Sequence, residues 1–262
     1  MKTNTSLFLA LIVTAIPACA VVLVSTDFNN ATLGAYANNA NINASGALTE
    51  RFKVAVNNTS PNTNKIEVVE ISPGNRAVEF TNGSTGGDCY IVNTFNALPT
   101  SVKGNNYIEG RFDLTVLCDT RSPQGVYNPT FQFLVNYYFN TAGSNSSAIH
   151  TNFRASGSLN STPSLGSDIL VELYVPYRYE FYVDLSSDTQ DTWGIKVTRI
   201  DNDQLLAERR GINTRTSNTT PERIVFSASA NPSSFRTDPF IRLDNIHIEA
   251  RNKILPTLMF LR

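Results

Sequence analysis

The chain has 262 residues, of which 41% are hydrophobic, 10% aromatic and only 16% charged, and its formal net charge is -1. This much apolar and aromatic material can fill a core, which argues against disorder. The near-zero charge, without a basic cluster, excludes the electrostatic footprint of a nucleic-acid partner.

Residues 1–20 predict a signal peptide. Lys2 supplies a positive charge, an apolar run follows from Leu7 to Ile16, and the small-x-small sequence Ala18-Cys19-Ala20 matches a cleavage site. The run is shorter than the ~20 residues needed to span a bilayer. We therefore expect cleavage after Ala20, a secreted or cell-surface location and no membrane span.

A lipid anchor is the alternative interpretation of this leader. The sequence at 16–19, Ile-Pro-Ala-Cys, is similar to a bacterial lipobox, which would make Cys19 a lipidated N-terminus. Pro17 fits that pattern poorly, and a strand-like run at 21–24 follows directly, where lipoproteins have a polar tether. Cleavage after Ala20 is the favoured interpretation.

Short runs of β-branched and aromatic residues, separated by Asn, Gly, Ser and Pro, make up the rest of the chain. Apolar residues alternate with polar ones, most clearly in 179–185, as in antiparallel strands with one buried face. We expect an all-β jelly-roll β-sandwich of two antiparallel sheets, with a single domain at 21–250 and a tail at 251–262. Strands are predicted near 21–26, 52–56, 65–71, 76–81, 89–95, 106–118, 130–139, 148–154, 169–175, 179–186, 192–200, 204–209, 223–229 and 240–249.

Local signals mark two turns and a bulge. Turns are predicted at 72–75 (Ser-Pro-Gly-Asn) and 201–203 (Asp-Asn-Asp). In the last strand, the apolar phase changes between 241–243 and 246–248. This change predicts a β-bulge or a strand crossing at Asp244-Asn245.

Two cysteines remain after the leader, Cys89 and Cys118. Each shares its phase with apolar neighbours, so both are expected to point inward. An even number of cysteines in an oxidising compartment favours a disulfide between them, and two buried free thiols are the alternative.

The two ends of the domain and one hairpin carry a family resemblance. Residues 24–29 (Val-Ser-Thr-Asp-Phe-Asn) and 239–248 resemble the terminal strands of secreted bacterial jelly-roll domains. The hairpin at 179–210 is similar to the paired strands of concanavalin A-like lectin/glucanase and laminin-G-like domains of bacterial surface proteins. The resemblance implies a jelly-roll sandwich with a carbohydrate-related role. Many such proteins end in a Pro-Glu-Pro sorting tail, which 253–262 lacks, so we expect free secretion or a lost tail.

Sugar binding requires aromatic faces and polar groups. The candidate ligand residues are Tyr137, Tyr177, Arg178 and Trp193. Tyr177 and Arg178 follow a Pro176 turn, where exposure is expected. Trp193 shares its phase with apolar residues, so core packing is its favoured alternative.

A structural calcium ion is predicted at Asp27 and Asp244. Asp27 comes just after the first predicted strand, and Asp244 lies at the predicted bulge of the last one. The two residues come close if the terminal strands pair. Carboxylate and backbone oxygens suit calcium. The alternative is that both residues only cap strand ends.

Enzymatic alternatives have weaker support. The Glu-x-Asp-x-x-Glu run of sandwich glycoside hydrolases is absent, although Glu172, Glu180 and Asp184 lie on neighbouring predicted strands. Residues 148–150 (Ala-Ile-His) are similar to the Gln-Ile-His strand of alginate lyases, but the partner Tyr-x-Lys-Ala-Gly run is missing. His150 would be the base of such a lyase.

The sequence therefore favours a secreted, non-catalytic protein that binds a polysaccharide or another glycan, or acts in adhesion. A lyase or hydrolase with an unrecognised site, and a structural envelope component, are the alternatives. Exposed aromatic rings would favour binding, and an open strand edge would favour the structural role.

Overall fold

The computed structural model describes residues 20–56, 64–81, 89–95, 106–117, 130–135, 147–154, 158–162, 169–170, 172–184, 192–213, 223–229, 239 and 241–252. These residues form strands and one 3-10 turn, η1 (Leu48–Glu50), and contain no α-helix. Across the same ranges, no helix is long and apolar enough to cross a membrane.

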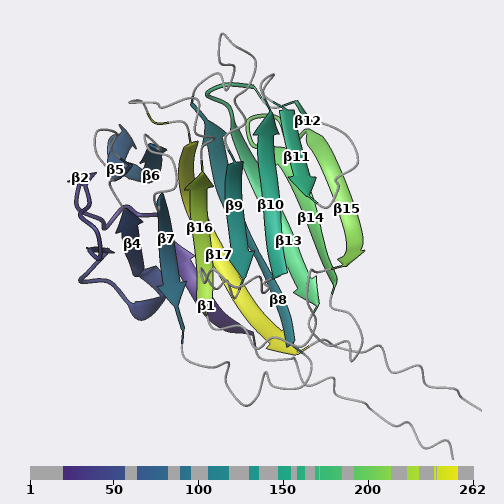
Figure 1. Ribbon diagram of the computed structural model, residues 1–262, viewed down its shortest axis with the longest axis horizontal. Helices are drawn as coiled ribbons and strands as arrows, with labels where there is room; N and C mark the ends of the chain where they lie inside the picture. Colours follow the sequence, from purple (N-terminus) through teal and green to yellow (C-terminus); the bar gives the residue numbers. More distant parts are fainter. Residues whose placement is uncertain are drawn as a thin grey trace, which may run out of the picture.

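The strands form two sheets in which every neighbouring pair is antiparallel (Figure 1). The nine-stranded sheet has the order β15 (Leu205–Asn213), β14 (Thr192–Arg199), β13 (Pro176–Asp184), β8 (Asn106–Val116), β17 (Ile241–Asn252), β6 (Asn75–Thr81), β5 (Lys65–Ser72) and β2 (Gly34–Ala35), with β1 (Val21–Thr26) paired to β17. The eight-stranded sheet has the order β12 (Ile169–Leu170), β11 (Ser158–Thr162), β10 (Ser147–Arg154), β9 (Thr130–Val135), β16 (Arg223–Ser229), β7 (Cys89–Thr94), β4 (Phe52–Val56) and β3 (Asn41–Ile42). The predicted jelly-roll β-sandwich is confirmed.

One hydrophobic core fills the space between the sheets. Phe112 of β8 and Phe226 of β16 meet across it edge to face, with ring centroids 5.3 Å apart. Phe112 also stacks on Tyr179 of β13 at 5.1 Å. These rings are almost fully buried because strand alternation turns every second side chain of both sheets toward the core.

The predicted irregularity in the last strand is confirmed as a bulge in β17. Asp244 pairs with Asp113 of β8, while His247 pairs with Arg111, so β17 has one extra residue in this interval. Asn245, within this interval, accommodates the extra residue by adopting a left-handed φ of 49°. The bulge lets both apolar stretches of β17 face the core, although their phases differ.

Both predicted turns are confirmed. Pro73 and Gly74 connect β5 to β6, and Gly74 has a φ of 76°, which glycine adopts without steric cost. The turn at 200–202 connects β14 to β15, and Asp203 after it has a φ of 56°.

Three strands were not predicted, and one prediction was too long. β2, β3 and β11 lie in stretches that look like polar loops in the sequence. Residues 172–175, expected to continue a strand, form a turn and irregular chain before β13. Polar β11 is held by backbone pairing with β10, which leaves no apolar pattern in the sequence.

Candidate functional site

The outer face of the nine-stranded sheet carries a concentration of polar and aromatic side chains. Along β13, burial alternates strictly, so one set of residues packs inward and the other faces outward. The outward set is Pro176, Arg178, Glu180, Tyr182 and Asp184. On the neighbouring strands β8, β14 and β17, register places outward residues beside these.

Three adjoining hollows form one groove across this face. A hollow of about 530 Å³ includes Tyr107, Tyr182, Asp184 and Thr192 in its lining. It shares Glu109, Glu180 and Phe181 with a second hollow, which in turn shares Arg111 and His247 with a third that reaches β1. We call these joined hollows the groove. It crosses the strands from β15 to β1.

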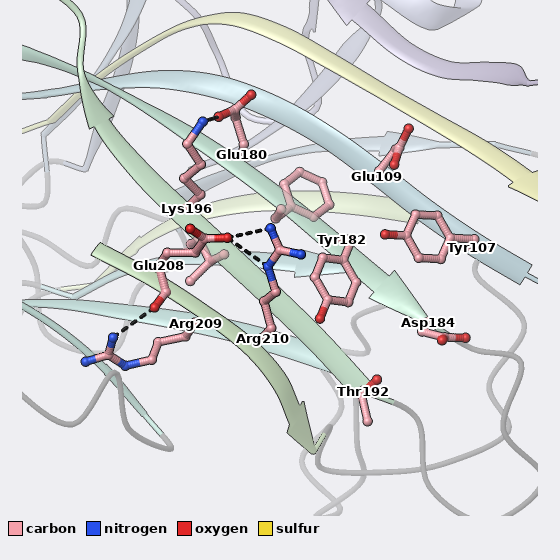
Figure 2. A pocket seen from close by; sticks show the side chains of 12 residues that line it. Tyr107, Glu109, Glu180, Tyr182, Asp184, Thr192, Lys196, Glu208, Arg209 and Arg210 are labelled. Atoms are coloured by element: carbon pink, nitrogen blue, oxygen red, sulfur yellow. Dashed lines mark hydrogen bonds and ion pairs between the residues drawn. The ribbon is translucent and has the colours of Figure 1, made fainter. Parts of the chain in front are cut away.

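Tyr107 of β8 and Tyr182 of β13 form a flat aromatic surface in the first of these hollows. Their ring centroids lie 5.6 Å apart with planes 8° from parallel, and Figure 2 shows the two rings side by side, both seen face-on. We call this pair the tyrosine platform. Arg251 lies 5.2 Å from the centroid of the Tyr107 ring.

Glycine makes room for the platform. A Cβ at Gly194 of β14 would collide with Cε1 of Tyr182, so the missing side chain lets the ring lie across the strand. The Tyr182 hydroxyl then accepts a hydrogen bond from the Gly211 N–H of β15 at 3.0 Å. The ring is therefore positioned by β14, which leaves room for it, and by β15, which donates the hydrogen bond.

Ion pairs lie near the platform, and Figure 2 draws two of them, Lys196 with Glu180 and Arg210 with Glu208. Lys196 Nζ lies 2.7 Å from Glu180 Oε2, and Arg210 lies 2.6 Å from Glu208. Arg251 Nη2 donates to Glu109 Oε2 at 2.6 Å. Exposed pairs of this kind contribute little to stability.

Glu109 is electrostatically perturbed. Burial is the main cause that raises its pKa above the usual value. Arg251 opposes this shift, and the Glu249 carboxylate, opposite Glu109 in the register with β17, adds to it.

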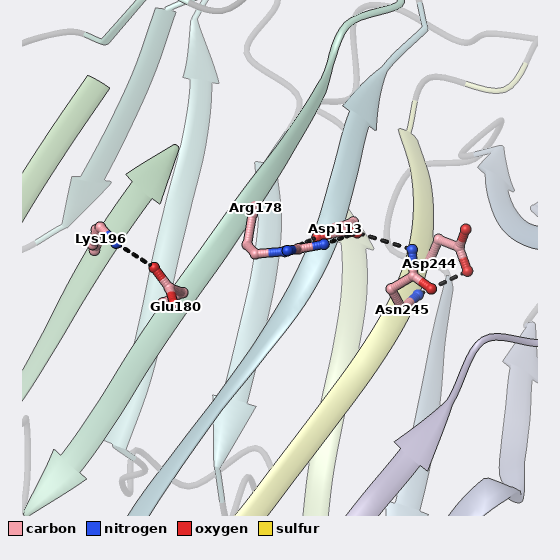
Figure 3. A network of polar contacts seen from close by, with 6 residues as sticks. All are labelled: Asp113, Arg178, Glu180, Lys196, Asp244 and Asn245. Atoms are coloured by element: carbon pink, nitrogen blue, oxygen red, sulfur yellow. Dashed lines mark hydrogen bonds and ion pairs between the residues drawn. The ribbon is translucent and has the colours of Figure 1, made fainter. Parts of the chain in front are cut away.

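A second polar network lies beside the bulge (Figure 3). Arg178 donates to both carboxylate oxygens of Asp113, at 2.9 and 3.0 Å, and Asn245 Nδ2 donates to Asp113 Oδ2 at 2.9 Å. Asp113 is only 6% exposed. Arg178, predicted as a ligand residue, thus lies on the outer face but holds a buried carboxylate.

Asp244 lies next to this network and is 7% exposed. Burial raises its pKa to about 7; the Asn245 N–H opposes the shift, while the Asp113 and Asp27 carboxylates add to it. The structure therefore brings Asp27 and Asp244 near each other, as pairing of β1 with β17 requires.

These residues fit a calcium ion only in part. A buried carboxylate beside other carboxylates is a ligand type that calcium prefers. Within the described ranges, however, no group of three or more acidic, His or Cys side chains is arranged to hold a metal ion. The remaining ligands would have to be backbone, amide or water oxygens.

The expected exposure of Tyr177 is wrong. Its ring is 2% exposed, because it shares the inward phase of Tyr179, and its hydroxyl accepts a hydrogen bond from the Glu172 N–H. Trp193 is 1% exposed and packs in the core, as its phase suggested. Tyr137 lies outside the described residues.

The disulfide stays a prediction. Cys89 is 1% exposed, as expected from its phase, and its Sγ lies 3.5 Å from the Thr81 carbonyl oxygen. Cys118 lies outside the described residues, as does the leader up to Cys19.

The carboxylates considered for hydrolysis do not form a close pair. Glu180 and Asp184 lie four residues apart on one strand, about 13 Å at the usual rise per residue, which exceeds the separation used by glycosidases. Glu172 pairs with Arg199.

His150, considered above as the base of a lyase, occupies a register position that the sequence did not reveal. It lies opposite Gln132 of β9, and Gln132 lies opposite Ser227 of β16. His150 and Gln132 are therefore neighbours in one row of the eight-stranded sheet.

Sequence reasoning missed Tyr107, Glu109 and Arg111 as groove residues. The signal was available, because Tyr107, Glu109 and Arg111 alternate with the apolar phase of the same strand. It was weak because the pattern does not say which outward residues of separate strands become neighbours.

The fold and groove define a two-sheet β-sandwich with a polar, aromatic groove on one outer face. Among solved structures, the chain is similar to the PL-14 alginate lyase from Aplysia kurodai, with 14% identity and a TM-score of 0.46 over 70% of this chain and 86% of that one. Alginate lyase Aly36B has 15% identity and a TM-score of 0.45 over 88% of this chain and 96% of its own. Winged bean acidic lectin has 9% identity and a TM-score of 0.45 over 76% and 96%, respectively.

No family model and no curated protein matches the chain.

Proposed function

We propose that the protein is a secreted or cell-surface β-sandwich that binds a polysaccharide or another glycan in the groove, without catalysis. The tyrosine platform is the observation that carries this proposal. Flat aromatic rings offer a surface for the apolar face of a pyranose, and nearby polar groups can take up its hydroxyls. Glu109, Asp184 and Thr192 line the same hollow as the platform.

The shape of the groove supports an extended ligand. It crosses six strands, from β15 to β1, which corresponds to about 24 Å at the usual strand spacing. A groove of this length suits several consecutive sugars better than a single one. The proposed ligand is therefore an oligosaccharide segment of a longer chain.

Removal of either platform ring tests the proposal. Tyr107→Ala and Tyr182→Ala should each lower glycan affinity about tenfold, because stacking on an aromatic ring contributes about 1 kcal/mol or more. Tyr174→Ala is the matched control, since Tyr174 is 69% exposed and lies outside the groove lining. Binding would be measured by calorimetry on a glycan selected from a polysaccharide array, with melting temperatures to confirm folding. Unchanged affinity in both platform variants would refute the site.

A structural calcium ion at Asp27 and Asp244 belongs to the same proposal. The support is a buried Asp244 carboxyl with carboxylate neighbours and no ion-pair partner in the described chain. Calcium would hold the strand that begins the domain against the strand that ends it.

A β-eliminating lyase is the second candidate function. One observation favours it: Gln132 and His150 are register neighbours on β9 and β10. A polar side chain that neutralises a uronate carboxylate and a base that removes the α-proton are the groups such a reaction needs. Incubation with polyuronates, followed by ultraviolet absorbance of the unsaturated product, tests it. Product formation that His150→Ala abolishes would establish the lyase, and its absence would favour the non-catalytic protein.

A further inference from the structure

Arg111 differs from the other arginine and lysine residues that line the groove. Lys196 pairs with Glu180, Arg178 with Asp113, and Arg210 with Glu208. Arg209 donates to the Glu208 carbonyl oxygen. Arg111 alone among the lining cations in the described chain has no hydrogen bond and no ion pair.

Two of the carboxylates around Arg111 are paired with other cations. Glu180, directly opposite it on β13, holds Lys196 at 2.7 Å. Glu109 on the same strand accepts from Arg251 at 2.6 Å. On β17, Glu249 lies 3.7 Å from His247 Nε2. The exposed Arg111 guanidinium is thus left without an ion-pair partner in the described chain.

The position of Arg111 within the groove gives this free charge a role. Arg111 and His247 line both the second and the third hollow, so they lie where the two meet, in the middle of the groove. They are also register partners across β8 and β17. A ligand that follows the joined hollows from the tyrosine platform toward β1 passes over them.

We propose that Arg111, with His247 beside it, binds the anionic group of an acidic polysaccharide, a uronate carboxylate or a sulfate ester. The guanidinium presents parallel N–H donors that match two oxygens of such a group. This inference rests on the proposed function, because it names the ligand class of the same groove. The platform would hold one sugar ring, while Arg111 holds the charge of another.

Glycans of matched length and different charge test the inference: a polyuronate, a sulfated polysaccharide and a neutral glucan. The wild-type protein should prefer at least one acidic glycan, and added salt should weaken that binding. Arg111→Gln should lower affinity for the preferred acidic glycan about tenfold and leave the neutral one unchanged. The affinity of Arg111→Lys for the acidic glycan should fall between those of the wild-type and Arg111→Gln proteins, since lysine keeps the charge without the paired donors.

Lys53→Gln is the control, because it removes the same charge from an exposed position on the eight-stranded sheet, outside the groove lining. A preference for the neutral glycan, or an Arg111→Gln protein with wild-type affinity for acidic glycans, would overturn the inference and leave platform-dependent binding intact. Absence of platform-dependent binding to any glycan would overturn the proposed function as well. The polyuronate and sulfate arms identify which anion the arginine takes.

Discussion

At the scale of single residues, the platform depends on the absence of a side chain at Gly194. Its position on the outer face of β14 is the one over which the Tyr182 ring lies. A methyl group at this position competes directly with the ring for space. A substitution at Gly194 should therefore shift the Tyr182 ring without removing a tyrosine.

Gly194→Ala should displace the Tyr182 ring and lower glycan affinity about tenfold, as loss of the ring itself would. The hydrogen bond from Gly211 would be lost at the same time. Calorimetric titration of the folded variant, compared with Tyr182→Ala, measures this. If Gly194→Ala bound like the wild-type protein, the flat ring position would have no part in binding.

Asp244 is a source of pH-dependent stability. Its pKa rises from 3.8 to about 7 on folding, so between these values the folded state holds a proton that the unfolded state has released. The free energy of unfolding should therefore fall as pH rises from about 4 to 7 and level off above 7.

Asp244→Asn removes this penalty. In chelator at pH 8, the variant should be more stable than the wild-type protein by about 1–3 kcal/mol, because Asn keeps an oxygen for the Asn245 N–H and carries no charge. Urea unfolding at pH 5 and pH 8 measures the effect. A wild-type stability that does not fall between these pH values would contradict it.

Sequence alone could separate inward from outward residues but not assemble the groove. The alternation of apolar and polar residues identifies Tyr182 as outward. The same alternation predicts that Tyr177 is buried, whereas the expected turn at Pro176 had suggested exposure. It cannot pair Tyr107 with Tyr182, because the register between β8 and β13 is set by the whole sheet. The unpaired state of Arg111 likewise depends on which strand lies on each side.

At the scale of elements, the bulge of β17 separates two segments of the strand that pair with different neighbours. Before it, β17 pairs with both β8 and β6; after it, β17 pairs with β8 and β1. The bulge was predictable because the apolar phase changes within one strand. β2, β3 and β11 were not, since β2 and β3 have two residues each and β11 is mostly polar, so none of them shows an alternating apolar pattern.

Asn245 should be sensitive to the kind of residue that replaces it. Asn245→Ala loses the bond to Asp113 and places an ordinary residue at a φ of 49°, so it should cost about 2–3 kcal/mol. Asn245→Gly loses the same bond without that strain and should cost less. Urea denaturation of both variants gives the order, and an equal or larger loss for Gly would argue against backbone strain at the bulge.

The strand at one edge of the nine-stranded sheet, β15, is relevant to the alternative that the protein is a structural envelope component. Its pairing with β14 has two irregularities, and Arg209 and Arg210 lie within it. Irregular register and charged residues are features that discourage a second chain from adding to a sheet. In the described chain, this edge therefore carries features that discourage assembly through strand addition.

At the scale of the whole molecule, closure of the domain depends on β1 and β17, and the proposed calcium ion would act there. Calcium should raise the melting temperature relative to chelator by several degrees, as ligands that bind only the folded state do. The increase should vanish in Asp27→Asn and Asp244→Asn proteins. Differential scanning fluorimetry with calcium and with magnesium measures it, and an equal increase in the variants would place the ion elsewhere.

The pairing of β1 with β17 also sets how the domain would respond to mechanical load. Val21 lies opposite Ala250, so the chain enters and leaves the sandwich at the same end of this strand pair. A force that pulls these two ends apart would break the backbone hydrogen bonds between β1 and β17 one after another rather than all at once. The domain would therefore open at low force when stretched between its ends, but it would keep its groove when held from one end alone.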